Sequence, residues 1–224
     1  VTYIKARYIQ EEVLLRQFDY HQDQFYLKPN PKYLFRGEQK YPSTKSSYHR
    51  LIDNEPKLVS ELTNFSLSLS TYLLQYLYPN ISRSNSNYWP TINELGTYLQ
   101  HYGFPVMFLD FTQNINIAAF FASHNNDSQS GRICILETST LLDSNEYILK
   151  LSNSNAQRPK QQEAFSLRMF DDKPDLKNSD HFKTVWIDFD LAQTDVIEFS
   201  NPKLLSTKGD KISDLIISYL NNHK

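Results

Sequence analysis

Apolar positions recur along this chain with two different periods, which predict both helices and strands. The longest helical pattern covers residues 56–78, where apolar side chains return every three or four positions and form one wide face. The members of that face are Leu58, Leu62, Phe65, Leu69, Tyr72, Leu73 and Tyr76. Pro56 suits the first turn of this helix, and Pro79 ends it. The same period predicts helices over residues 8–18 and 210–220.

Short apolar runs bounded by turn residues predict the strands. They cover residues 33–36, 106–109, 132–137, 164–170, 182–189 and 195–199. Gly37 is expected to end the first strand, residues 139–151 to be helical, and residues 153–162 to be irregular. Because strands and helices mix without strict alternation, the pattern favours an α+β fold over a regular βαβ array.

The predicted organisation is a single domain with an N-terminal extension. Residues 1–30 form a helical extension, and residues 31–224 form an α+β domain that ends in a helix. We expect a small, split sheet, antiparallel or mixed, flanked by helices.

The most informative stretch is the segment of residues 99–122. A helix over residues 90–102 is expected to begin at a capping box with Thr91 as its N-cap, and to end at Gly103. Asp110 and Thr112 then follow a short strand and precede an apolar helix. Polar side chains at such a junction are typical of binding sites, but the same residues can also cap the following helix.

Composition and charge narrow the function classes. Of the 224 residues, 40% are hydrophobic and 21% are charged, which is an ordinary globular composition. The net charge of -2 argues against a protein built around nonspecific nucleic-acid binding. No apolar run approaches the roughly 18 residues of a membrane-spanning helix, and no secretory signal is visible. We therefore expect a cytoplasmic protein that does not enter membranes.

Cysteine, glycine and histidine usage excludes several kinds of site. The single Cys134 rules out an internal disulfide and a multi-cysteine zinc site, and its apolar surroundings predict a buried thiol. The five glycines are widely spaced, so neither a dinucleotide fingerprint nor a phosphate loop is present. The histidines lack metal-ligand spacing, and we predict no metal site.

Several separated motifs together resemble the FRG domain family, which is named for a (Phe/Tyr)-Arg-Gly motif. That motif stands here as Phe35-Arg36-Gly37, followed by Glu38, and a Pro-Ser pair with a later Arg resembles Pro42-Ser43 and Arg50. The most specific pieces are Gln100-His101-Tyr102-Gly103-Phe104-Pro105, Leu109-Asp110-Phe111-Thr112 and Ala118-Ala119-Phe120-Phe121-Ala122. A last piece contains Arg158, Gln161, Gln162, Ala164 and Phe165.

The chain departs from the family pattern at a few positions. Val106 and Met107 stand where the family often has Thr-Arg, and Glu163 stands where Gly is usual. The missing Arg removes one cation that the family pattern would place near an anionic ligand.

The family layout is similar to that of ADP-ribosyltransferase folds. Such folds place an aromatic-Arg or aromatic-His pair on a first strand, a Ser/Thr/Tyr element before an apolar helix, and a Glu or Gln near a later strand. The resemblance implies an enzyme that uses NAD as substrate and modifies a protein or nucleic acid, as a bacterial or phage-linked toxin or defence effector. The catalytic candidates that it implies are Arg36, His101, Asp110, Thr112 and Gln162. The ligand-binding candidates are Phe35, Gly37, Glu38, Arg50, Gln100, Tyr102, Phe111, Arg158 and Gln161.

Each role in this scheme has a physical basis. Arg36 is suited to hold a phosphate with two parallel hydrogen bonds. An aromatic ring, from Tyr102, Phe111 or Phe120, can stack on nicotinamide. One residue among 161–163 would bond the ribose hydroxyl, and His101 can act as an acid, a base or a neutral donor.

Structural explanations stand beside these roles. Arg36 can be a buried arginine paired with Asp110 or Glu38, and His101 can satisfy the last carbonyls of its helix. The whole chain can also be a noncatalytic domain that senses a nucleotide or phosphate or binds a protein. A metal-independent nuclease that uses His101 and Arg36 is a further alternative.

Overall fold

The computed structural model describes residues 32–39, 44–84, 88–124, 130–138, 148–150, 155–169, 175–177, 182–190 and 202–222. The helical extension predicted for residues 1–30 and the strand predicted for residues 195–199 lie outside these ranges.

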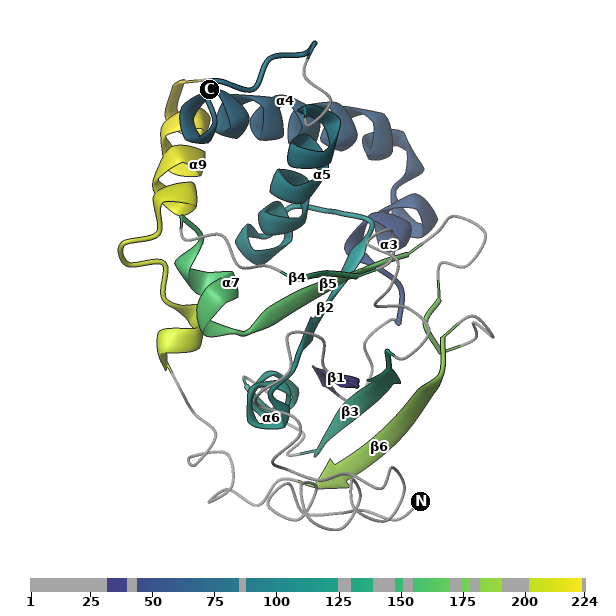
Figure 1. Ribbon diagram of the computed structural model, residues 1–224. Coiled ribbons are helices and arrows are strands. Elements are labelled where there is room, and N and C mark those ends of the chain that lie inside the picture. The colour runs from purple at the N-terminus through teal and green to yellow at the C-terminus, as the bar shows by residue number, and fades with distance from the viewer. Residues whose placement is uncertain are drawn as a thin grey trace.

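Within the described residues, six strands form one antiparallel sheet in the order β4-β5-β2-β1-β3-β6 (Figure 1). The strands are β1 (Tyr33–Gln39), β2 (Phe108–Thr112), β3 (Ser130–Glu137), β4 (Ile148–Lys150), β5 (Ala164–Arg168) and β6 (Thr184–Asp190). With the helices described below, this sheet confirms the predicted α+β class.

The sheet divides between β1 and β2. These two strands pair through only one position, where Phe35 lies opposite Thr112. In contrast, β1 pairs with β3 along its full length, and β2 does the same with β5. The β4-β5-β2 half and the β1-β3-β6 half therefore diverge, and the backbone groups between them are left for side chains to bridge.

Helices cover both halves of the sheet. They are α3 (Ser47–Asn54), α4 (Val59–Leu77), α5 (Tyr88–Leu99), α6 (Ile115–Ser123), α7 (Gln157–Gln161) and α9 (Lys211–Asn222). Short 3-10 turns occur at η3 (Pro56–Leu58), η4 (Gln100–Tyr102) and η5 (Pro202–Leu205). Figure 1 shows α4, α5 and α9 gathered beside the β4-β5-β2 half, whereas α6 packs near β1 and β3.

The hydrophobic core follows this division. One cluster joins α4, α5 and α9 through buried side chains that include Leu69, Leu73, Leu95 and Ile216. A second cluster lies on the sheet. Its members include Leu34, Leu109, Phe111, Cys134 and Leu167. Cys134 is fully buried, as predicted, and this burial raises the pKa of its thiol well above the usual value.

The long apolar helix is confirmed, with Pro56 in its opening turn. Leu69 and Leu73 in the middle of its predicted face are buried, but Leu58 and Tyr76 near its ends remain 39% and 57% exposed. Periodicity thus identified the face correctly, while the neighbouring helices cover only its central part.

Two predicted boundaries in the central segment were wrong. The α5 helix begins at Tyr88, so Thr91 lies inside the helix and is not its N-cap. The second strand covers residues 108–112, because pairing with β5 continues to Thr112. Asp110 and Thr112 therefore belong to the strand, and Asn114 caps α6 by accepting a hydrogen bond from the backbone N–H of Asn116.

The structure also differs from the predictions outside the central segment. Gly37 lies within β1 and does not end it. Residues 157–161 form a short helix where irregular structure was predicted, and residues 148–150 form a strand where a helix was predicted. Residues 47–54 form a helix for which the sequence analysis gave no prediction. No helix in the described ranges is long and apolar enough to cross a membrane.

Candidate functional site

A cavity of about 850 Å³ lies beside the division between β1 and β2. Its volume falls in the range of small-molecule sites. Most predicted site residues line it: Phe35, Arg36, Gly37, Glu38, Gln100, His101, Tyr102, Asp110, Phe111, Thr112, Arg158 and Gln162. Arg50 and Gln161 do not line the cavity, and Gln161 is exposed on the surface.

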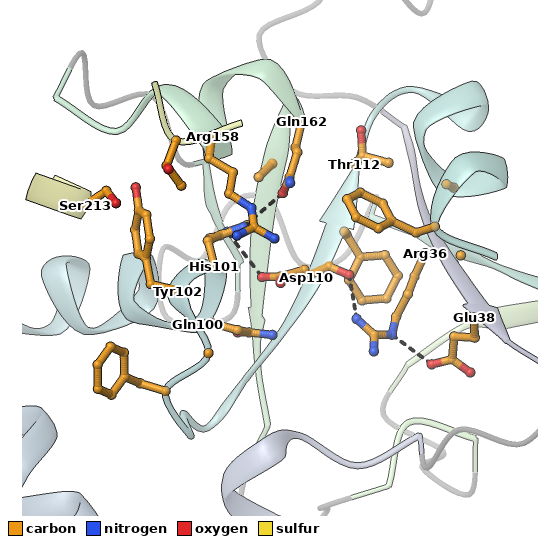
Figure 2. Close-up of a pocket in the computed structure, with 18 of the residues that line it drawn as sticks. Arg36, Glu38, Gln100, His101, Tyr102, Asp110, Thr112, Arg158, Gln162 and Ser213 are labelled. Carbon is orange, nitrogen blue, oxygen red and sulfur yellow. Dashed lines mark hydrogen bonds and ion pairs between the residues drawn. The ribbon is translucent and has the colours of Figure 1, made fainter. Parts of the chain in front are cut away.

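Separate elements bring the polar side chains of this cavity together (Figure 2). Strand β1 supplies Arg36, β2 supplies Asp110, and the η4 turn supplies His101. Gln162 follows α7 directly. The turn after η4 depends on Gly103, whose φ of 91° lies in the left-handed region that favours glycine.

Arg36 bridges the two halves of the sheet. Its Nε donates to Oε1 of Glu38 at 2.8 Å, and its Nη1 donates to the backbone carbonyl of Asp110 at 2.9 Å. The side chains of Arg36 and Glu38 are only 17% and 1% exposed. This pairing agrees with the structural explanation for Arg36, because its charge is already balanced and its donors link β1 to β2.

Arg50 lies outside the cavity but within electrostatic reach of this pair. Its Nη1 donates to the carbonyl of Lys45 at 2.7 Å. Burial and the nearby charge of Arg36 lower the pKa of Arg50, while Glu38 opposes that shift. The predicted role of Arg50 in ligand binding thus has no support from its position.

His101 is held by a chain of hydrogen bonds. It is 5% exposed, and its Nδ1 lies 3.0 Å from Oε1 of Gln162. The Nε2 of Gln162 in turn donates to the carbonyl of Leu204 at 2.7 Å. His101 was also predicted to satisfy the last carbonyls of its helix, and this was wrong. Its Nδ1 faces Gln162 and its Nε2 has no hydrogen-bond partner among the described residues, while the helix-end carbonyls accept from the backbone N–H groups of Gly103 and Phe104.

The other ring nitrogen of His101 faces Asp110. Its Nε2 lies 3.4 Å from Oδ1 of Asp110, without the alignment of a hydrogen bond. Both atoms are buried and have no hydrogen-bond partner among the described residues. The Asp110 side chain is nevertheless 33% exposed. Two polar atoms without partners at a cavity wall indicate a place where a ligand can bond.

Thr112 has a structural partner. It is buried, and its Oγ1 accepts a hydrogen bond from the backbone N–H of Asn114 at 3.1 Å. Thr112 therefore shapes the turn between β2 and α6. The predicted catalytic role is not needed to explain its position.

The structure separates the alternatives among residues 161–163. Gln162 reaches the cavity, whereas the carboxylate of Glu163 accepts from the side-chain amides of Gln113 and Asn114 at 3.1 and 3.2 Å. Glu163 has a φ of 47°, in the left-handed region, which is where the family pattern has glycine. Its hydrogen bonds hold a turn that glycine would adopt more readily.

Asp210 is a central buried residue that the sequence analysis did not select. It is 0% exposed, and its Oδ2 accepts from the Tyr102 hydroxyl at 2.5 Å and the Arg158 backbone N–H at 3.1 Å. Its Oδ1 accepts from the backbone N–H of Ser213 at 3.1 Å and caps α9. An aspartate directly before an amphipathic helix was the available signal, although it predicts only the cap.

Replacing Tyr102 by phenylalanine tests this buried connection. Burial and the hydrogen bond to Asp210 raise the pKa of Tyr102 well above its usual value, so the folded protein retains the phenolic proton. We expect Tyr102→Phe to lower the free energy of unfolding by about 1.5–3 kcal/mol at neutral pH. The Tyr102 contribution should persist up to about pH 10 and decline above it, because the unfolded chain then loses the proton more readily.

Urea unfolding of the wild type and Tyr102→Phe between neutral and alkaline pH measures this effect. The difference between the two proteins should shrink as the pH rises above about 10. A difference that stays constant, or grows, would contradict the assignment.

The aromatic candidates also differ in access to the cavity. Phe111 contributes to its wall but is almost fully buried in the core, and Phe120 packs elsewhere with Ile117 and Leu204. Tyr102 and Phe121 are half-buried and line the cavity. Phe121 was missed as a candidate, since its motif suggested only helix packing.

No group of residues suited to hold a metal occurs in the part of the chain that the structure describes.

Comparisons with known proteins place part of the chain in a known family. No curated protein and no solved structure matches the chain. The FRG domain model matches residues 31–131, a range that includes Arg36, His101 and Asp110 and excludes Arg158 and Gln162. This chain therefore contains an FRG domain.

Proposed function

We propose that this FRG-domain protein is an NAD-dependent ADP-ribosyltransferase-like enzyme. It transfers ADP-ribose to a protein or nucleic acid and acts in the bacterial cytoplasm as a toxin or defence effector, encoded by a bacterium or a phage. The observation that carries the enzymatic part is the polar wall formed by His101 and Asp110, whose facing atoms are buried and lack hydrogen-bond partners among the described residues at a cavity large enough for a nucleotide.

Asp110 has the chemistry that glycosyl transfer requires. When the bond between nicotinamide and ribose breaks, its electron pair leaves with nicotinamide and positive charge develops on the ribose. The Asp110 carboxylate, partly exposed, stabilises that charge. An acceptor group then forms a bond to the same ribose carbon, and the proton that it loses passes to the carboxylate. Asp110 is therefore the catalytic residue in this proposal.

Other lining residues suit the remaining parts of NAD. The Nε of Arg158 is buried and has no hydrogen-bond partner among the described residues, and Arg158 lines the same cavity as Gln162 and His101 (Figure 2). A guanidinium with unused donors is suited to bind the pyrophosphate. The half-buried ring of Tyr102 or Phe121 can stack on nicotinamide. Arg36 serves instead to position β2, because its donors already bond Glu38 and the Asp110 carbonyl.

One observation favours a second candidate, a noncatalytic nucleotide-sensing domain. The carboxylate of Glu163 bonds Gln113 and Asn114, and that of Glu38 bonds Arg36. Asp110 is thus the one carboxylate at the cavity wall, within the described residues, that is not paired with an arginine or a lysine. A site with one such carboxylate can hold a nucleotide without cleaving it.

Nicotinamide release from NAD distinguishes the two candidates. With a cell lysate as the source of acceptors, we expect the wild type to release nicotinamide, and Asp110→Asn to lower the initial rate by at least about 100-fold. His101→Gln should also lower the rate, because it changes the polar wall beside Asp110.

The control is Gln161→Ala, a change at an exposed position next to the site, which should retain the wild-type rate. Melting curves must show that every variant is folded. If the folded wild type binds NAD but releases no nicotinamide, the sensing domain replaces the enzyme. An Asp110→Asn variant that retains the full rate would eliminate Asp110 as the catalytic residue.

A further inference from the structure

The orientation of the Gln162 side chain determines which nitrogen of His101 carries a proton. The carbonyl oxygen of Leu204 can only accept a hydrogen bond, so the group 2.7 Å from it must be the amide nitrogen of Gln162. The amide oxygen of Gln162 then faces Nδ1 of His101 at 3.0 Å. Since this oxygen also can only accept, Nδ1 must carry the proton.

In the neutral form of the ring, the lone pair is therefore on Nε2. That atom lies 3.4 Å from the carboxylate oxygen of Asp110, and both atoms are buried without a hydrogen-bond partner among the described residues. In that form two acceptors face one another and gain nothing from the contact, and leaving them unpaired is costly. A ligand that donates hydrogen bonds would satisfy both atoms.

We infer that Gln162 is a positioning residue, which holds His101 as an acceptor for a ribose hydroxyl of the ligand. Neighbouring hydroxyl groups on one ribose supply two donors close together, one for Nε2 of His101 and one for Oδ1 of Asp110. This inference rests on the proposed function and refines it, because it places the ribose that carries nicotinamide against these two residues. Gln162 itself acts through His101 and needs no contact with the ligand.

The proton on Nδ1 can be measured without a ligand. At about pH 9, where imidazoles are neutral, ¹⁵N NMR of the folded protein should show Nδ1 of His101 protonated and Nε2 unprotonated. The His101 signals are assigned by their loss in His101→Gln. Gln162→Leu removes the acceptor and should abolish this preference, whereas Gln162→Glu retains an acceptor oxygen and should preserve it.

Binding measurements test the ribose assignment with two probes, ADP-ribose and ADP. Both contain adenosine and pyrophosphate, but only ADP-ribose has the terminal ribose. We expect the wild type to bind ADP-ribose at least about tenfold more tightly than ADP. That ratio should fall at least about threefold in Gln162→Leu and should be retained in Gln162→Glu and in the exposed neighbour Gln161→Leu.

The outcomes separate this inference from the proposed function. Equal affinity of the wild type for ADP-ribose and ADP overturns the ribose assignment while nucleotide binding stands. If neither probe nor NAD binds, the proposed function fails together with the ribose assignment, and the NMR result alone decides the positioning role. A wild-type His101 protonated on Nε2 and not on Nδ1 overturns that role.

Discussion

Gly37→Ala should lower the free energy of unfolding by at least about 3 kcal/mol. A β-carbon at this position would lie 1.7 Å from the carbonyl oxygen of Ala118 and 2.9 Å from the amide nitrogen of Ala122. Both atoms belong to the backbone of α6, so no side-chain rotation can relieve the overlap. The helix would have to move away from β1, and α6 also supplies Phe121 to the cavity wall.

Gly96 provides a matched control within α5. A β-carbon there meets only the Ser70 hydroxyl oxygen, at 3.9 Å, which is ordinary contact. Because alanine is the better helix former, Gly96→Ala should be neutral or stabilising by up to about 1 kcal/mol. Urea denaturation of both variants measures the difference. If Gly37→Ala is as stable as the wild type, the close approach of α6 to β1 is wrong.

The close approach of α6 gives the glycine of the Phe-Arg-Gly motif a structural role. Gly37 was predicted to bind the ligand, and it does lie at the cavity. The space that its missing side chain leaves is taken by the backbone of α6. We therefore interpret Gly37 as a packing position that sets the distance between helix and strand.

Breaking the ion pair between Arg36 and Glu38 should cost about 3–5 kcal/mol of stability. The two side chains are mostly buried, and the second carboxylate oxygen of Glu38 has no partner among the described residues. Arg36→Met therefore leaves an unbalanced buried charge. It also removes the hydrogen bond from Arg36 to the Asp110 carbonyl, which bridges the division of the sheet.

A double variant separates stability from function at this position. Arg36→Met combined with Glu38→Leu removes both charges and should recover most of the lost stability in urea denaturation, because apolar side chains of similar size replace the pair. The control is Asp53→Asn, which breaks the exposed pair with Lys45 and should cost less than about 1 kcal/mol.

These variants prevent a misreading of activity data. A folded double variant that still releases nicotinamide would show that neither Arg36 nor Glu38 makes a contact that the reaction requires. A folded double variant without activity would show that the reaction requires the pair, through contact with the ligand or through the bond that holds the Asp110 backbone in place. Single Arg36 variants cannot make this distinction, and a loss of less than about 1 kcal/mol in them would contradict the burial of the pair.

Local patterns in the sequence predicted much of the fold. The period of the apolar residues located α4 and α9, and the apolar runs located β3, β5 and β6. The order of the motifs also selected most residues of the cavity wall, including His101, Asp110 and Gln162. These features depend on neighbours along the chain, such as the helical period or a glycine after a helix, and so a single sequence contains them.

Tertiary structure alone decided how these residues are used. Pairing with β5 extended β2 through Asp110 and Thr112. The approach of α6 from a distant part of the chain required glycine at position 37 within β1.

The partners of His101 likewise come from distant segments. Its Nδ1 faces Gln162, and Gln162 is oriented by the carbonyl of Leu204. Periodicity and motif spacing describe which residues are near one another along the chain. They carry no information on which donor meets which acceptor across the fold, and that pairing determines whether a polar residue supports the structure or is left to bind a ligand.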